Sequence, residues 1–170
     1  MPDPAELVRV ADAITTELTT AQTGGVFVGL EDFAPERSYA DWANDLDALE
    51  GLKVDVVPVS YEQTELVDRG TIGYLCSADV GVRKWFDRSQ QGAQNRITRS
   101  AIDRLVLFIQ ELHEFFCKPP DGIGRRLATY ESAVWQETKI RVTYSRKHLH
   151  SHRMFLGIVR VQYSVDKASQ

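Results

Sequence analysis

Apolar residues recur along the chain at two different spacings, and each spacing predicts a different kind of element. Over residues 5–21 they fall three and four positions apart, which predicts an amphipathic N-terminal helix. The same period over residues 96–117 predicts the principal helix, with an apolar face covering about half of its circumference. Leu107 stands alone on the polar side of this helix and is a candidate contact residue.

Strict alternation of apolar and polar residues predicts the strands. It is clearest over residues 71–85, where one face is apolar and the other, carrying Asp79, is mostly polar. We interpret Asp79 as an outward-facing carboxylate. Residues 134–144 and 154–165 alternate in the same way, and shorter strands are expected at 26–30 and 52–60. Pro58 places the last of these at a sheet edge or a strand end.

The order of these elements is helix, strands, long helix, strands, with an additional short helix expected at residues 39–49. Strands grouped with strands indicate an α+β fold, in which a mostly antiparallel sheet is packed by the N-terminal helix and the long central helix. The length of 170 residues fits one domain over residues 1–170, with residues 166–170 expected to form a frayed tail.

Composition narrows the class of protein. Hydrophobic residues make up 43 %, enough for a core, and the formal net charge of −4 does not indicate a general nucleic-acid binder. No apolar run approaches the ~20 residues of a membrane span, so no membrane partner is expected. The N-terminus lacks the features of a signal peptide, and Cys76 and Cys117 are interpreted as reduced thiols of a cytosolic product.

Common catalytic and cofactor motifs are absent from the sequence, which contains no GxGxxG, P-loop, GxSxG or HExxH. The acidic cluster of Asp41, Asp45, Asp47 and Glu50 does not have the spacing of a calcium loop and is interpreted as a solvated helix face. We therefore expect no cofactor and no enzymatic activity.

The segment Lys147–Arg153 places His148, His150 and His152 at every second position. In an extended segment these imidazoles project to one side and could bind Zn²⁺. The cationic neighbours Arg146, Lys147 and Arg153 oppose binding of a dication, and no carboxylate is evident to orient the ligands. The favoured interpretation is an exposed basic loop between two strands, used for contact with an acidic partner or DNA.

A second contact candidate is the polar loop over residues 87–95. Its composition cannot offset the entropy of ordering by burial, so we expect it to be mobile in the isolated subunit. Arg88, Gln90 and Gln91 are its candidate partner contacts.

Taken in order, several stretches of the chain resemble the tail terminator, or tail completion, proteins of long-tailed bacteriophages. These stretches are "LVRVADAITTEL", "LDALEGLKVDVVPVS", "TIGYLCSADVGVRKW", "ITRSAIDRLVLFIQELHEFF", "ETKIRVTYS" and "MFLGIVRVQYSV". The resemblance implies a small α+β subunit, without catalytic residues, that assembles into a ring, expected to be a hexamer. The ring would cap the tail tube and offer a docking surface to the head.

The same resemblance implies the partners and the location. The partners are other copies of the chain, the tail tube protein, a head-completion or connector protein and DNA passing through the ring. The protein would be assembled in the host cytoplasm and found in the neck of the virion. Three alternatives remain open: another neck or connector component, a metal-dependent enzyme using His148, His150 and His152, and a monomeric ligand-binding domain.

Overall fold

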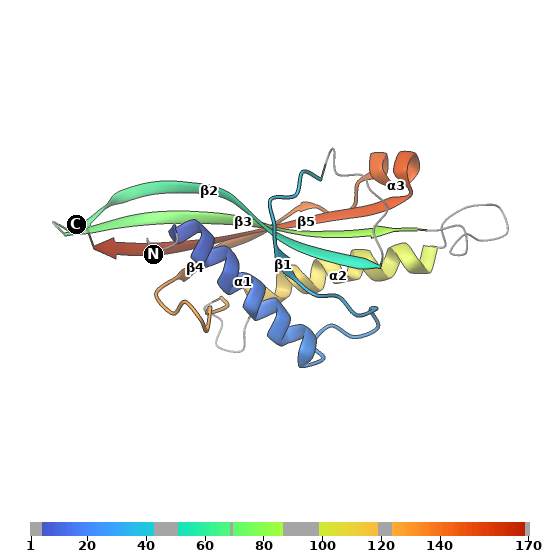
Figure 1. Cartoon of the computed structure of the whole chain (residues 1–170), viewed down its shortest axis with the longest axis horizontal. Helices are drawn as coiled ribbons and strands as arrows, with labels where there is room; N and C mark the ends of the chain where they lie inside the picture. The colour runs from blue at the N-terminus through green and yellow to red at the C-terminus, as the bar shows by residue number, and fades with distance from the viewer. Residues whose placement is uncertain (1–4, 43–50, 69, 87–98, 119–123, 169–170) are drawn as a thin grey trace.

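A mixed five-stranded sheet forms the body of the protein, and two long helices cover one of its faces (Figure 1). The computed structural model describes residues 5–42, 51–68, 70–86, 99–118 and 124–168. In chain order the elements are α1 (Glu6–Thr23), β1 (Glu36–Arg37), β2 (Leu52–Asp68), β3 (Thr71–Trp85), α2 (Arg99–Cys117), β4 (Val134–Val142), α3 (Arg146–His152) and β5 (Met154–Ala168).

The strand order in the sheet is β1-β2-β3-β5-β4. The short β1 runs parallel to β2, and every other pair is antiparallel. The predicted α+β fold, with a mostly antiparallel sheet packed by an N-terminal helix and a long central helix, is therefore confirmed.

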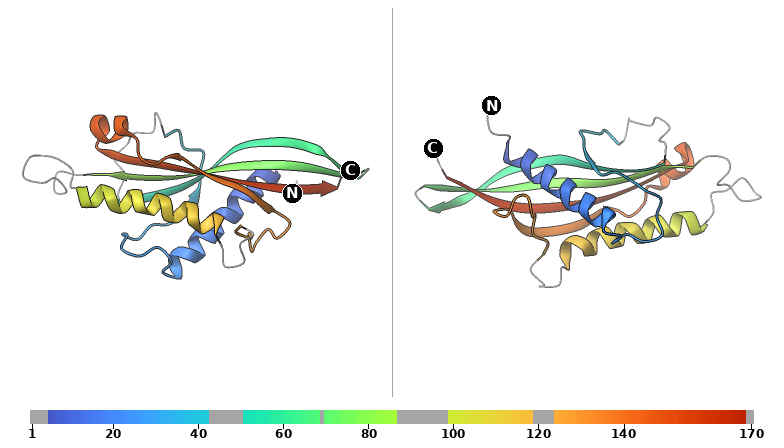
Figure 2. Two further views of the ribbon diagram at one scale, coloured as in Figure 1. Left: turned by 180° about the vertical axis from the view of Figure 1, so that it is seen from behind. Right: turned by 60° about the horizontal axis from the view of Figure 1, so that its bottom comes forward.

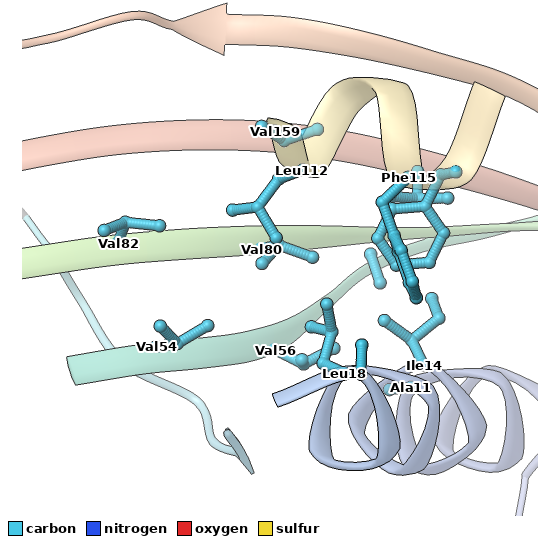
Figure 3. Close-up of a cluster of buried hydrophobic side chains, with 14 of the residues drawn as sticks. Ala11, Ile14, Leu18, Val54, Val56, Val80, Val82, Leu112, Phe115 and Val159 are labelled. Carbon is cyan, nitrogen blue, oxygen red and sulfur yellow. The ribbon is translucent and has the colours of Figure 1, made fainter. Parts of the chain in front are cut away.

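The core lies between the sheet and the two long helices (Figure 3). Ile14 and Leu18 of α1 face the valines of β2 and β3, while Leu112 of α2 lies beside Val159 of β5. Helix α2 packs closely on β5 at Gly157. A Cβ atom at this position would lie only 2.4 Å from Ile109 Cδ1. The apolar faces that the sequence predicted for α1, α2 and β3 are thus the faces that pack together.

Two strands are longer than the sequence predicted. The strand expected at 52–60 continues to residue 68, and β5 continues to Ala168. Residues 166–168 were expected to belong to a frayed tail, but they pair with β3, ending at Thr71↔Ala168. Backbone pairing holds this polar end in the sheet although its side chains are exposed. Residues 169–170 lie outside the described residues.

The strand expected at residues 26–30 is not present; this segment is a turn. Phe27 is buried and packs edge-on against Phe108 of α2, with ring centroids 5.1 Å apart, whereas Val26 and Val28 are exposed. Gly25 and Gly29 have φ values of 71° and 75°, which an extended strand does not accommodate. The short helix expected at 39–49 lies mostly outside the described residues, and residues 39–42 are not helical.

The sheet extends well beyond its helical cover. The distal ends of β2, β3 and β5 continue past the start of α1 as a three-stranded ribbon (Figures 1 and 2). We call this ribbon the arm; it comprises residues 61–68, 71–75 and 164–168. At the opposite end of the sheet, α3 packs on β5, and Phe86 N donates to the Arg153 carbonyl at 2.8 Å.

Candidate functional site

The three histidines lie in helix α3, so the prediction of an extended loop is wrong. The hydroxyl of Ser145 caps the helix by accepting from His148 N at 3.3 Å, and Arg153 ends it with a φ of 52°. Leu149 is buried beneath the helix. A seven-residue helix is too short to reveal its period in the sequence, and the Ser145 cap together with the packing of Leu149 against the body fixes it.

The helix separates the imidazoles instead of aligning them. His148 and His152 are one turn apart with ring centroids at 6.0 Å, whereas His150 lies on the exposed side. Among the residues that the structure describes, no group of three or more His, Cys, Asp or Glu side chains is arranged to hold a metal ion. The trio consequently does not form the one-sided ligand set that an extended segment would have given.

His148 acts as a connection between α3 and a distant segment. Its Nε2 lies 3.1 Å from the Trp42 carbonyl, which only accepts, so Nε2 donates. Its Nδ1 lies 2.7 Å from Ser145 Oγ and accepts the hydroxyl proton in the neutral tautomer. Both ring nitrogens are therefore engaged in holding the structure together.

The segment that His148 holds crosses the second face of the sheet. We call residues 36–42 the strap. Ser38 N donates to the Val56 carbonyl at 3.0 Å, and Trp42 lies over Gly81. Beneath the strap, Arg83 Nη2 is 2.7 Å from Asp55 Oδ2, and both side chains are at most 1 % exposed. A buried ion pair of this kind needs its partners in place, because a lone buried charge is costly.

Asp79 lies on the outward face of β3, as interpreted, but it is only 7 % exposed. Arg160 of β5 binds it with two bonds, Nε to Oδ1 at 2.7 Å and Nη2 to Oδ2 at 2.9 Å. The bond to Asp79 raises the pKa of the Arg160 guanidinium. The sequence alone does not indicate that these two residues pair. Their contact follows from the strand register, which places Asp79 opposite Arg160.

The outer edge of β4 is open. Within the described parts of the chain, no strand pairs with that side of β4, and Val134 is 54 % and Ile140 37 % exposed. Two features interrupt this edge. One is the ion pair of Glu137 with Lys139 at 2.8 Å, and the other is the irregular register of β4 with β5. Charges and bulges of this kind limit unspecific pairing, so contacts here would be selective.

The arm exposes a second surface. Tyr61 stacks on Tyr74 with ring centroids 4.4 Å apart, and burial, followed by its bond to Tyr74, raises the pKa of Tyr61. Val59 and Tyr61 are nevertheless partly exposed along β2. Beyond its two pairs with β1, the outer side of β2 has no partner strand among the described residues, so Pro58 lies at an open edge, one of the two positions predicted, and not at a strand end.

Leu107 is 45 % exposed on α2, as its position on the polar side of the helix predicted. One turn away, Arg104 donates to the Val28 carbonyl, which brings the exposed turn at residues 26–30 to the same part of α2. Whether Leu107 contacts a partner remains a prediction. Arg88, Gln90 and Gln91, with the rest of the loop at 87–95, lie outside the described residues.

Both cysteines are free thiols, in agreement with the sequence analysis. Burial raises the pKa of Cys76 to about 11. It also raises the pKa of Cys117, whose sulfur lies 3.4 Å from His113 Nε2. Both thiols are therefore less acidic than an ordinary cysteine.

A cleft of about 580 Å³ lies where α1, β4 and the segment 124–133 meet. Two of the charged side chains on its walls pair with each other, since Glu17 lies 3.4 Å from Arg125 Nη1, and Glu17 also accepts from Ala128 N at 2.8 Å. Arg125 also donates to the Phe115 carbonyl at 3.0 Å. These bonds connect α1 and the end of α2 to the segment 124–133, so the side chains on the walls of the cleft hold the fold together.

No protein-family model matches the chain, and no curated protein matches its sequence. None of the described helices combines the length and the apolarity that crossing a lipid bilayer requires.

Proposed function

We propose that this chain is a structural subunit of the neck of a long-tailed bacteriophage, a tail terminator that forms a ring on the end of the tail tube. The order of its elements and the local pattern of its residues resemble those of that family over most of the chain. The α+β architecture, with an antiparallel sheet packed by two helices, agrees with what the resemblance implies.

The observation that carries the proposal is the pair of open surfaces at the two sides of the sheet. One is the outer edge of β4 with Val134 and Ile140, and the other is the outer side of β2 with Val59, which continues into the arm with Tyr61. The two surfaces differ, so contact between them is heterologous, and heterologous contacts close into a ring when the rotation permits. Exposed strand edges also call for a partner or for protection.

In this proposal the ring binds the tail tube protein on one side and a head-completion or connector protein on the other, in the virion neck. The closest alternative is another head–tail connector component, which would use the same surfaces. The metal-dependent enzyme is not favoured, because α3 turns His150 away from His148 and His152.

Native mass spectrometry of the purified protein, alone and with polymerised tail tubes, tests the proposal. We expect a ring-sized oligomer or, if assembly needs the tube, density at one tube end in negative-stain electron micrographs. The double variant Val134→Glu/Ile140→Glu should abolish assembly while the melting temperature stays within a few degrees. The control is Val26→Glu/Val28→Glu, which places two charges on exposed valines, 54 % and 74 % exposed, away from the edge. A chain that stays monomeric and does not bind to the ends of tail tubes would contradict the proposal.

A further inference from the structure

Positively charged side chains on and near α3 lack the carboxylate partners that most other Lys and Arg side chains of the described residues have. Most Lys and Arg side chains of the described residues have a carboxylate within 4.0 Å, including Arg83, Arg104 and Arg125. Six have no such partner in the described parts of the chain: Arg99, Arg126, Arg141, Arg146, Lys147 and Arg153. Four of these six fall within thirteen residues of sequence, in a chain whose acids outnumber its bases by 24 to 20.

These four residues lie at the end of β4 and on or next to α3, and we call them together the basic surface: Arg141, Arg146, Lys147 and Arg153. Arg141 is the penultimate residue of β4, Arg146 and Lys147 begin α3, and Arg153 ends it. The helix is fixed beneath them by the Ser145 cap and by buried Leu149. The positions of the charges are therefore set by the fold and not by a free loop.

No acidic residue lies in the sequence between Glu137 and Asp166, so the basic surface is not neutralised from its own segment. The nearby cations Lys139 and Arg160 already have carboxylate partners and add no net charge. Asp41, which precedes Trp42 on the strap, is an acidic residue of the described chain in the segment that His148 holds. Counted over the described residues alone, the four cations keep a local positive excess on a protein of net charge −4.

We propose that the basic surface binds the phosphate backbone of a nucleic acid without reading its sequence. Three of its four cations are arginines, whose planar guanidinium groups bind phosphate oxygens with two parallel bonds. Two partly exposed aromatic side chains lie at the same end of the sheet, Tyr144 just before α3 and Trp85, which pairs with Met154. Cations beside exposed aromatic rings are typical of surfaces that bind nucleic acid strands non-specifically.

Binding to DNA can be measured by the fluorescence anisotropy of a labelled 20-base-pair duplex of mixed sequence at 50 to 200 mM salt. Contact with four phosphates predicts a slope of about −3.6 for log affinity against log salt. The variant Arg146→Gln/Lys147→Gln should weaken binding by about tenfold or more and reduce the slope by about 2. Arg141→Gln should weaken it further.

The matched control is Lys118→Gln/Arg126→Gln, which removes two exposed positive charges elsewhere. It should change the affinity less than twofold, and a second duplex of different sequence should bind equally well. No binding at 50 mM salt, or an equal loss in the control, would overturn the proposal. Tighter binding to poly-glutamate than to the duplex would also overturn it and would assign the surface to an acidic protein. Native mass spectrometry of the same samples reports the oligomeric state separately, so a failure of DNA binding is distinguished from a failure of ring assembly.

Discussion

Trp42 fills the space over Gly81, so that a Cβ at residue 81 would lie 2.3 Å from its Cζ2 atom. This contact docks the strap on the second face of the sheet, above the buried Asp55–Arg83 pair. From the other side His148 holds the Trp42 carbonyl. One glycine in the middle of a strand thus determines whether a segment forty residues upstream can cover a buried charge.

Replacing Gly81 with alanine should displace the indole and reduce the free energy of unfolding by about 1–3 kcal/mol, because the site has no room for a methyl group. Urea denaturation measures the loss. In a Trp42→Ala background the same substitution should cost less than about 0.5 kcal/mol, since the clashing ring is gone. An equal cost in both backgrounds would locate the strain in β3 itself and contradict the docking role.

Removing the charge of Asp79 should destabilise the protein by about 2 kcal/mol, because Arg160 then loses its two-bond partner on a largely buried site. We expect this loss for Asp79→Asn in thermal or urea denaturation. Glu137→Gln is the matched control, because it breaks an exposed pair with Lys139 and should cost at most about 0.5 kcal/mol. Similar losses in the two variants would show that Asp79 is solvated.

The histidines of α3 should differ in their importance for stability. His148→Ala removes the bonds to Ser145 and Trp42 and should cost about 1 kcal/mol. His150→Ala changes an exposed side chain on the same helix and should stay within about 0.5 kcal/mol. Chemical denaturation of the two variants compares them directly. If His150→Ala proved the more costly, the tautomer and contacts assigned to His148 would be wrong.

Tyr130 gives a pH dependence of stability at high pH. Its hydroxyl donates to buried Glu6, and burial, followed by this bond, raises its pKa to about 12. Because the folded pKa exceeds the ordinary tyrosine value of 10.0, the stabilisation is complete below about pH 10 and is lost as pH rises toward about 12. Tyr130→Phe should therefore cost about 2 kcal/mol at pH 8, and this difference should shrink above pH 10.

Urea titrations of the wild type and Tyr130→Phe at pH 8, 10 and 11 measure this change. Tyr144→Phe, at an exposed tyrosine, is the control and should show no such pH dependence. A difference between wild type and Tyr130→Phe that stays constant from pH 8 to 11 would mean that Tyr130 does not carry the effect.

The amino-acid sequence by itself determined the elements in which a regular spacing of apolar residues repeats over a long run. Alternation along the chain gives β3 its 15 residues, Thr71–Trp85, as predicted, and the 3.6-residue period identifies α1 and α2. Because each of these elements turns one apolar face to the core, the same periods also predicted which residues form the core and that the fold is α+β.

Only the tertiary structure decided what occupies the other face of the sheet. Asp79 and Arg160 are eighty-one positions apart, and their pairing depends on strand register. The strap, its seat on Gly81 and the helical form of α3 likewise depend on contacts between distant residues, Trp42 with Gly81 and Trp42 with His148. Local periodicity records burial on one face of an element, but it carries no information about which distant polar group will meet another, because that is fixed by the relative placement of whole elements.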